Sequence, residues 1–360
     1  MATTSANNSP SLRGDVLPGK RLVVMMPALN EEATIAEVIE AIPRQIEGVG
    51  SVKVVVIDDG STDRTAELAE SVGAKVVRHT VNRGVGAALA TGLDCALGLG
   101  ADVIVNMDSD GQFNPADIPA LIRPILDEGY GFVTCTRFGG THSMDEMPPA
   151  KRWGNRMMCR IVNAMIGGGN FTDVSCGFRA YSRETALRLV LFGKFTYTQE
   201  MFIDLASKNV AMTEVALPVR AVREHGESRV ANSLVRYARR ASLILVRSMR
   251  DTRPLTFFGL VAILLLLVGI GLFGFVAVWW VYTGRTSPWT SLLTLGTSCL
   301  VAAISSGVMA LLADQIGRGR RIQEQTLYFQ RRQYYNEMAR EAVAEELAMD
   351  ASASKFSSLG

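Results

Sequence analysis

Two long uncharged segments near the carboxyl end constrain this chain more than any other feature. Leu255–Val281 and Trp289–Ala313 contain no charged side chain. Each exceeds the ~20 apolar residues needed to cross ~30 Å of hydrocarbon. The link between them, Tyr282–Pro288, is too short for a domain, and aromatic residues cluster beside it, as they do at membrane surfaces. We therefore expect a transmembrane hairpin over residues 254–314 rather than two core helices of a soluble protein, which are rarely this long.

Arginine residues flank the two segments unequally. Three arginines closely precede the first segment and three follow the second, whereas the link contains only Arg285. Because lysine and arginine gather on the cytoplasmic side of membrane spans, we expect both termini and the large amino-terminal region to be cytoplasmic, in an inner, plasma or equivalent membrane. The five cysteines are scattered and form no CxxC pair, which agrees with a reducing compartment.

The region before the hairpin alternates between strand and helix patterns. Apolar runs rich in Val and Ile predict strands at Arg21–Met26, Val52–Ile57, Lys75–Arg78, Val103–Met107 and Phe132–Thr136. Helical patterns lie between them, at Glu31–Ile42, Arg64–Val72, Gly84–Leu97 and Ala116–Leu126. This alternation predicts an α/β, Rossmann-like domain over residues 21–228 with a mostly parallel sheet, in which ligands bind at the carboxyl ends of the strands.

Three other segments complete the predicted organisation. Residues 1–20 are polar, lack the apolar core of a signal peptide and predict a disordered tail. Residues 229–253 place six arginines within an arc of roughly 100° on a helical wheel, which predicts a basic amphipathic helix in the headgroup layer; residues 152–166 show a weaker version. Residues 315–360 predict a charged, cytosolic helical tail that could pack on the domain, join subunits of a homo-oligomer or stay solvated.

Polar clusters follow three of the predicted strands, the first, the second and the fourth. The cluster after the fourth strand is the most informative. Asp108 and Asp110 are separated by one residue, so in an extended segment their side chains point the same way. Two carboxylates and the amide oxygen of Gln112 form an all-oxygen set, which hard cations such as Mg²⁺ or Mn²⁺ prefer. Gly111 permits the turn that would bring Gln112 back. The cluster predicts a metal site at the ligand-binding edge of the sheet.

Five motifs, taken in order, resemble those of family 2 glycosyltransferases with a GT-A fold. They are Pro27-x-x-Asn30-Glu31, Asp58-Asp59-Gly-Ser-Thr-Asp63, Asn82-x-Gly84, Asp108-Ser-Asp110-Gly-Gln112 and Ser175-Cys-Gly-Phe-Arg179. Within that family the chain is most similar to the polyprenyl-phosphate hexosyltransferases, which include dolichyl-phosphate mannose synthases and bacterial prenyl-phosphate glucosyltransferases. The resemblance covers about residues 21–250, and a terminal transmembrane hairpin fits the bacterial members. None of the motifs specifies the sugar.

The resemblance implies roles for individual residues. The nucleotide-sugar pocket would be lined by Pro27, Leu29, Glu31, Ile57, Asp58, Asp59, Asp108, Ser109 and Asp110. Asp108, Asp110 and Gln112 would hold Mg²⁺ or Mn²⁺ against the diphosphate. The acceptor phosphate would be bound by Arg137, Arg152, Arg223 and Arg229, although the last two depart from the family pattern by one extra residue and an Arg in place of Lys at 229. The catalytic residues would be Asp110, Arg137 and Glu200, and Glu200 could equally be an acid that begins a helix.

The implied reaction is an inverting transfer of a hexose from a nucleotide sugar, of the UDP-glucose or GDP-mannose type. The acceptor would be a polyprenyl phosphate, dolichyl or undecaprenyl, at the cytosolic face of the membrane. A lipid monophosphate is already an oxyanion near neutral pH, so it needs positioning by arginine more than deprotonation.

Other functions fit the sequence less well. A processive polysaccharide synthase shares the fold but uses a QxxRW motif and more spans, and Ala150-Lys-Arg-Trp153 is the nearest match. An inactive sugar-nucleotide sensor or membrane scaffold would not need the intact acidic motif. A dinucleotide-binding oxidoreductase would need a GxGxxG turn after the first strand, which this chain lacks. Nucleic-acid binding is not expected, because the basic stripe abuts a span and lacks interleaved aromatics.

Overall fold

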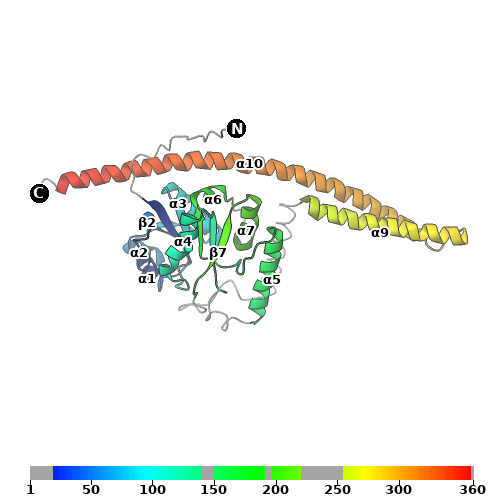
Figure 1. The fold of residues 1–360 in the computed structure, drawn as a ribbon, viewed down its shortest axis with the longest axis horizontal. Coiled ribbons are helices and arrows are strands. Elements are labelled where there is room, and N and C mark those ends of the chain that lie inside the picture. The colour runs from blue at the N-terminus through cyan, green and yellow to red at the C-terminus, as the bar shows by residue number, and fades with distance from the viewer. Residues whose placement is uncertain (1–18, 139–148, 191–196, 220–253, 358–360) are drawn as a thin grey trace, which may run out of the picture.

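The computed structural model describes residues 19–138, 149–190, 197–219 and 254–357 (Figure 1). The domain that precedes the predicted transmembrane hairpin is built on a seven-stranded sheet with the order β3-β2-β1-β4-β6-β5-β7. The strands are β1 (Lys20–Ala28), β2 (Val49–Asp58), β3 (Lys75–Arg78), β4 (Val103–Asn106), β5 (Phe132–Thr136), β6 (Arg179–Ser182) and β7 (Met212–Ala216). All five predicted strands are present, which confirms the mixed α/β architecture.

The sheet is parallel on one side and mixed on the other. β1 pairs in parallel with β2 and β4, β2 with β3, and β5 with β7. β6, which the sequence pattern does not predict, runs antiparallel between β4 and β5. The parallel pairs set the carboxyl ends of β1, β2 and β4 at one edge, which is where ligands bind in such sheets.

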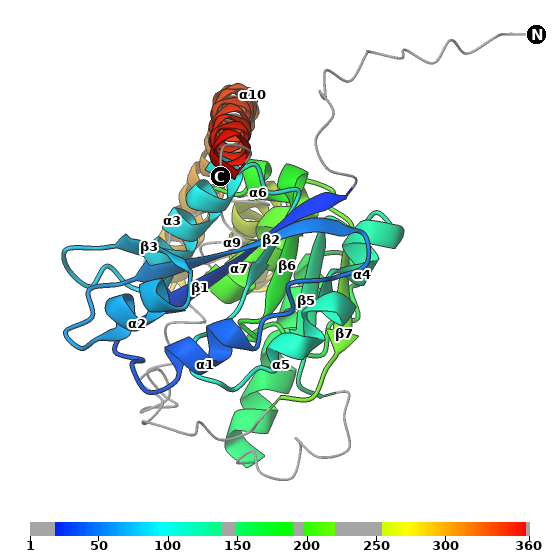
Figure 2. The ribbon, with the colours of Figure 1, turned by 90° about the vertical axis from the view of Figure 1, so that its left-hand side faces the viewer.

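Helices cover both faces of the sheet (Figure 2). One face packs on α3 (Val85–Gly98), α5 (Pro149–Met165), α6 (Arg183–Arg188) and α7 (Tyr197–Ser207). The other face packs on α1 (Ile35–Glu40), α2 (Thr65–Ser71) and α4 (Ile118–Asp127), which follows the short turn η1 (Pro115–Asp117). Alternate residues of β1 supply the two cores: Val23 and Met25 belong to the first, and Leu22 and Val24 to the second. This period of two is what a strand buried on both faces requires.

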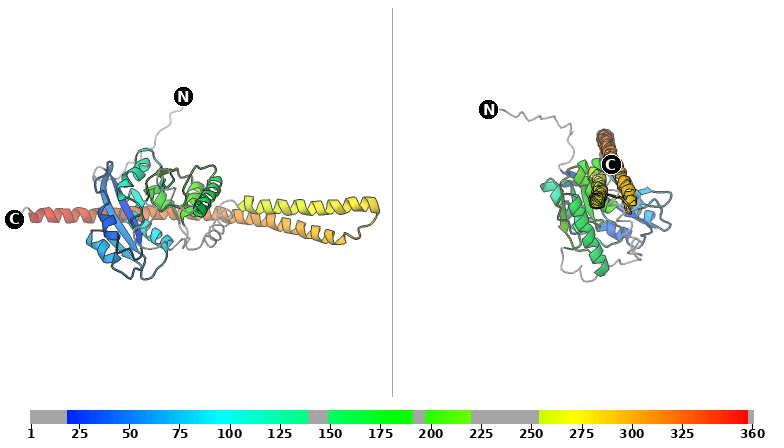
Figure 3. Two further views of the ribbon diagram at one scale, coloured as in Figure 1. Left: turned by 90° about the horizontal axis from the view of Figure 1, so that it is seen from below. Right: turned by 90° about the vertical axis from the view of Figure 1, so that its right-hand side faces the viewer.

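Two helices follow the domain and project from it as a hairpin (Figures 1 and 3). α9 (Pro254–Thr283) and α10 (Thr290–Ser357) are both long and apolar enough to cross a membrane. Leu260, Leu264 and Leu267 are 67%, 62% and 62% exposed, so α9 is no core helix of a soluble domain. The two helices approach closely where Gly269 faces Gly296, because a Cβ on Gly269 would lie 3.2 Å from the Gly296 carbonyl oxygen.

α10 does not end with the hairpin. It continues as one helix for 68 residues and runs back along the domain, over α3 and α6 (Figures 1 and 2). The predicted boundary at residue 314 therefore falls inside a single helix, and the charged tail packs on the domain. The predicted amphipathic helix over residues 229–253, and residues 1–18 of the predicted tail, lie outside the described residues.

Candidate functional site

The ends of β1, β2 and β4 bring three of the sequence motifs to one edge of the sheet. In the parallel register Ala28 lies beside Asp58, and Met25 lies beside Asn106. β4 therefore ends two residues before Asp108, with the ends of β1 and β2 alongside. The polar residues that follow these three strands therefore lie together, as predicted from the sequence.

Ser109 locks the acidic motif onto the end of β1. Its hydroxyl donates to the Pro27 carbonyl oxygen at 3.0 Å. Its own carbonyl oxygen accepts a hydrogen bond from the Thr34 hydroxyl at 2.7 Å. Ser109 is 3% exposed, so these bonds form away from competing water. The residue between the two carboxylates thus acts as their structural anchor.

The two carboxylates of the motif occupy a tightly shaped turn. A Cβ added to Gly177 would lie 2.7 Å from Oδ2 of Asp108, so the Asp108 carboxylate rests directly against the Gly177 backbone. Gly111 has φ +73°, a conformation that favours glycine, and the Gln112 N–H donates to Oδ1 of Asp110 at 3.1 Å. Asp110 is 2% exposed. The predicted turn at Gly111 is therefore present.

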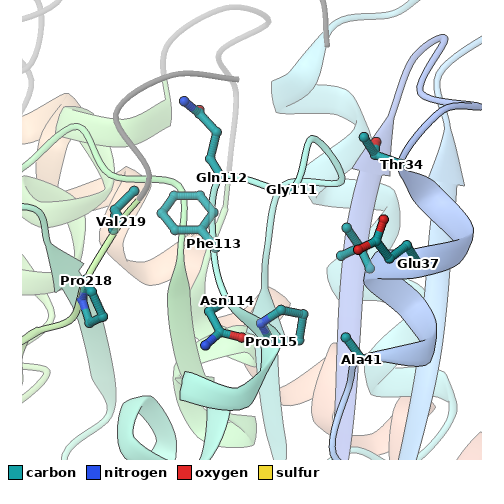
Figure 4. Close-up of a pocket in the computed structure, with 11 residues that line it drawn as sticks. Thr34, Glu37, Ala41, Gly111, Gln112, Phe113, Asn114, Pro115, Pro218 and Val219 are labelled. Carbon is teal, nitrogen blue, oxygen red and sulfur yellow. The ribbon is translucent and has the colours of Figure 1, made fainter. Parts of the chain in front are cut away.

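The residues of this turn fit a cation that is shared with a substrate. Within the described ranges, no group of three or more His, Cys, Asp or Glu side chains gathers as a metal site. The protein would thus offer Asp108 and Asp110, and Mg²⁺ is usually bound by one or two carboxylates together with substrate phosphates. Because Gly177 has no side chain, the Asp108 carboxylate has room against its backbone. Figure 4 shows the Gln112 side chain directed away from Phe113, although both residues line the neighbouring cleft.

Asp58 is buried and held by protein donors. Its Oδ1 accepts from the Ser61 N–H at 2.8 Å, and its Oδ2 accepts from Nε of Arg78 at 2.8 Å. The carboxylate therefore orders the loop that follows β2 and joins it to the end of β3. This accounts for an acid at the end of a buried strand, which a helix cap alone does not.

The Asp59 carboxylate accepts one hydrogen bond more than that of Asp58. Its Oδ1 accepts from Nδ1 of His79 at 2.7 Å and from the Arg83 N–H at 2.9 Å, and its Oδ2 accepts from the Gly84 N–H at 2.8 Å. Nε2 of His79 lies 3.0 Å from the Thr91 hydroxyl. The sequence analysis does not single out His79, although its place directly after β3, at the same edge, is a usable signal.

The remaining residues predicted for the nucleotide pocket fall in two groups. Pro27, near the end of β1, and Leu29 and Glu31, just after it, are half-buried. Asn30 has φ +53°, and its side-chain oxygen accepts from the loop after β2, so the two loops are joined at the pocket edge. Ile57 is fully buried in the core beneath α3, where it supports the strand end from below.

Arg137 follows β5 and is fixed by a buried acid. Its Nε donates to Oδ2 of Asp173 at 2.6 Å, and its Nη2 donates to Oδ1 of Asp173 at 3.0 Å and to the Ser175 hydroxyl oxygen at 2.8 Å. Burial lowers the pKa of Arg137, but the hydrogen bond and charge of Asp173 outweigh burial and raise that pKa above its ordinary value. The guanidinium is therefore charged and held in one orientation. The sequence analysis does not anticipate Asp173.

Arg179 connects the last sequence motif to α7. It is fully buried, and its Nη2 donates to the carbonyl oxygens of Val174 at 3.2 Å and Thr198 at 3.3 Å. Its guanidinium carbon also lies 5.3 Å from the centre of the Phe202 ring. Because Thr198 is in the first turn of α7, this arginine places the predicted residue Glu200 relative to the motif. Arg152 lies on α5, whereas Arg223 and Arg229 lie outside the described residues.

We call the turn formed by residues 108–112 the acidic turn. A cleft of about 470 Å³ lies beside it, between α1 and the segment after Gly111 (Figure 4). Gln112 and Phe113 line one wall, and Val219 adjoins them. Phe113 forms an isolated antiparallel bridge with Val219. The chain after β7 is thereby tied to the acidic turn.

Known proteins resemble the chain in sequence and in fold. The model of "Glycosyl transferase family 2" matches residues 23–189. Over 262 residues the chain is 33% identical to Glycosyltransferase AglJ of Haloferax volcanii, with 72% of this chain and 82% of that protein covered. Over 188 residues it is 31% identical to the UDP-N-acetylglucosamine–dolichyl-phosphate N-acetylglucosaminyltransferase of Methanococcus voltae, with 48% and 72% covered. The solved structure of glucosyl-3-phosphoglycerate synthase from Mycobacterium tuberculosis with uridine-diphosphate matches with a TM-score of 0.50 at 27% identity, covering 64% of this chain and 79% of that one.

Proposed function

Because the chain belongs to glycosyltransferase family 2, we propose that it transfers a hexose from a nucleotide sugar to a polyprenyl phosphate, with inversion at the sugar. The observation that carries this proposal is the Asp108–Gln112 turn at the carboxyl edge of the sheet, in a chain whose helices α9 and α10 are long and apolar enough to cross a membrane. The Methanococcus voltae relative is named for a dolichyl-phosphate acceptor, which supports a lipid phosphate here.

The donor would occupy the edge formed by β1, β2 and β4. Pro27, Leu29 and Glu31 would contact the nucleotide, between loops that Asp58 and Asp59 hold in place. Asp108 and Asp110, with Gln112 nearby, would hold Mg²⁺ or Mn²⁺ beside the diphosphate. A divalent cation there neutralises the charge that develops on the leaving nucleoside diphosphate. Ser109 and Gly177 keep the two carboxylates in place before substrate arrives.

The acceptor phosphate would be bound by arginine. The guanidinium of Arg137, oriented by Asp173, would pair with the phosphate, and Arg152, Arg223 and Arg229 would add positive charge. A phosphate oxygen forms the new bond to the anomeric carbon while the bond to the diphosphate breaks on the opposite side. No proton has to be removed from a phosphate that is already ionised. Glu200 would then orient the sugar.

The membrane hairpin would bring the enzyme to its lipid substrate. We propose that the domain and both termini are cytoplasmic, since arginines flank the outer ends of the two uncharged segments. Nucleotide sugars are water-soluble donors, so a cytosolic domain beside the bilayer meets both substrates at the surface.

The proposal is tested with the full chain in lipid vesicles. Vesicles that contain undecaprenyl phosphate are incubated with Mn²⁺ or Mg²⁺ and a panel of radiolabelled nucleotide sugars. Label from one donor should move into the organic phase as a lipid that carries one sugar. Asp110→Asn should abolish this transfer, whereas Asp127→Asn, at an exposed acid of α4, should not change it.

Three results would count against the proposal. Transfer from no donor would favour a scaffold or sensor, and a product with many sugars would favour a polysaccharide synthase. A wild-type rate in Asp110→Asn would show that the acidic turn is not the reaction centre.

A further inference from the structure

α10 carries the chain from the membrane hairpin onto the back of the domain without a break. Its apolar part, Thr290–Ala313, has a length of about 36 Å at ~1.5 Å per residue, enough to span the hydrocarbon. Further along, the residues that are shielded from solvent recur every three or four positions and form one face. They are Glu324, Tyr328, Arg331, Tyr335 and Ala339, and we call them the docking face.

Asp94 on α3 is the centre of the contact. Its Oδ1 accepts from Nη2 of Arg331 at 2.8 Å and from the hydroxyl of Tyr335 at 2.8 Å. Tyr335 is 8% exposed and belongs to the hydrophobic core that α3 covers. A helix that contributes an aromatic ring to the core of the domain is part of that domain, because burying such a ring stabilises the contact beyond its polar bonds.

Further contacts extend the attachment to two other helices. The Tyr328 hydroxyl donates to Oε1 of Glu184 on α6 at 2.7 Å. Nη1 of Arg331 donates to the Leu189 carbonyl oxygen, just after α6, at 2.7 Å. Glu324 lies 3.6 Å from Nζ of Lys208, just beyond the end of α7. Three helices of the domain thus hold α10 at successive points along its length, which fixes both its direction and its rotation.

The docking face lies away from the acidic turn. α3 begins next to Gly84, whose N–H bonds Asp59, and Asp94 follows ten residues later. Ten helical residues span about 15 Å, so Asp94 lies near the opposite end of α3 from the site. A change at the docking face can therefore alter where the domain sits without touching the residues that bind substrate.

We propose that α10 is a rigid strut that sets the height and orientation of the catalytic domain above the bilayer, with Asp94, Arg331 and Tyr335 as its attachment to the domain. Arg331 follows Ala313 by eighteen residues, or about 27 Å along a continuous helix. The strut thus places the sheet within a few tens of ångströms of the lipid surface. The proposal rests on the proposed function, since the height matters because the acceptor phosphate is embedded in the bilayer.

Insertions in α10 test the strut. Seven helix-forming residues between Gly319 and Arg320 preserve the docking face, because seven residues turn the helix by about 700°, and they lengthen the strut by about 10 Å. Seven Gly and Ser residues at the same place break the strut but still allow the domain to approach the bilayer. The matched control places the same two insertions between Arg340 and Glu341, beyond the docking face.

Each variant is assayed in vesicles with two acceptors: undecaprenyl phosphate in the bilayer and a water-soluble, short-chain prenyl phosphate. The helical insertion should raise the KM for the embedded acceptor at least tenfold, and the flexible insertion should raise it less. Neither should change the KM for the nucleotide sugar or the rate with the soluble acceptor. Both control insertions should behave as wild type. Equal losses with both acceptors, or no loss with either, would overturn the proposal.

A second measurement does not depend on activity. A fluorophore at Glu47, whose side chain is 92% exposed, reports its distance from the bilayer by energy transfer to labelled lipids. The helical insertion should move it away by about 10 Å, and the control insertion should leave it unmoved. An unchanged distance refutes the strut even if no transfer is seen. Conversely, a wild-type protein that transfers no sugar to either acceptor, but shows the expected shift, would refute the proposed function and keep the strut.

Discussion

Gly177→Ala should disable the acidic turn while leaving the protein folded. The added Cβ would stand 2.7 Å from Oδ2 of Asp108, whereas ordinary contacts begin at 3.4 Å, so the carboxylate has to move by about 0.7 Å. Gly177 does not have a positive φ, so alanine meets no backbone strain there. The atom in the way is the end of a side chain, which can rotate at little cost to stability.

The expected loss of activity is therefore large compared with the loss of stability. Misplacement of a catalytic group by about 1 Å can cost on the order of 10²-fold in rate. We expect kcat to fall by about 10- to 100-fold and the Mn²⁺ concentration for half-maximal activity to rise, with the unfolding midpoint in urea almost unchanged. The measurements are transfer to undecaprenyl phosphate over a series of Mn²⁺ concentrations, and urea unfolding.

A double-mutant cycle checks the cause. If Gly177→Ala acts by displacing Asp108, it should have no further effect once Asp108 is replaced by alanine. A full additional loss in the Asp108→Ala background would refute this reasoning. So would a single Gly177→Ala variant whose transfer rate stays within twofold of wild type.

Three further predictions concern stability, acceptor binding and pH. Arg179→Met should destabilise the domain by about 2–4 kcal/mol in urea unfolding, because the buried carbonyl group of Val174 and the partly buried one of Thr198 lose their donor. Asp173→Asn should raise the KM for the lipid phosphate by about tenfold, but not that for the donor, because Arg137 loses the charge that orients it. Burial, with the hydrogen bond to Asp94 and its charge, raises the pKa of Tyr335 to about 12. The phenol stays protonated to a higher pH in the folded than in the unfolded chain, so its contribution to stability is present below pH 10 and is lost as the pH rises towards about 12. Alkaline unfolding of Tyr335→Phe should lack this part of the pH dependence.

Five of the seven strands, β1 to β5, could be predicted from the sequence. Phe132–Thr136 was predicted with the bounds that β5 has, and β1 and β2 extend their predictions by only a few residues. These strands are buried on both faces, so they appear as continuous apolar runs. The polar residues that follow these runs contrast with them in the same way, so the sequence alone predicts the acidic turn.

β6 could not be read in this way. Its four residues, Arg179–Ser182, include an arginine and a tyrosine that are fully buried, and no apolar run marks them. Arg179 is tolerated there because Val174 and Thr198 supply carbonyl oxygens and Phe202 supplies an aromatic ring. Asp173 escaped notice because its importance comes from Arg137, which lies 36 positions away along the chain. Such pairs exist only in the folded protein.

The second half of α10 was predicted as a helix, but its attachment was left open. The change from apolar to charged residues near Ala313 suggested a boundary, although a helix can continue through a change of solvent. The shielded positions of the docking face recur with helical spacing, and their tyrosines and arginine are unlike a fully solvated surface. The helical spacing of these tyrosines and this arginine is the feature of the sequence that could have predicted the attachment of α10.

The docking of α10 also has a consequence for biosynthesis. Asp94 and its partner Arg331 are separated by 237 positions, with the whole membrane hairpin between them. At about 5–20 residues per second, the ribosome needs roughly 12–50 s to reach Arg331 after Asp94 has been made. The outer surface of α3 is therefore not covered by α10 while the hairpin is synthesised. The domain can acquire its last core aromatic, Tyr335, only after both apolar helices have been made, so the core of the domain is completed at the end of synthesis.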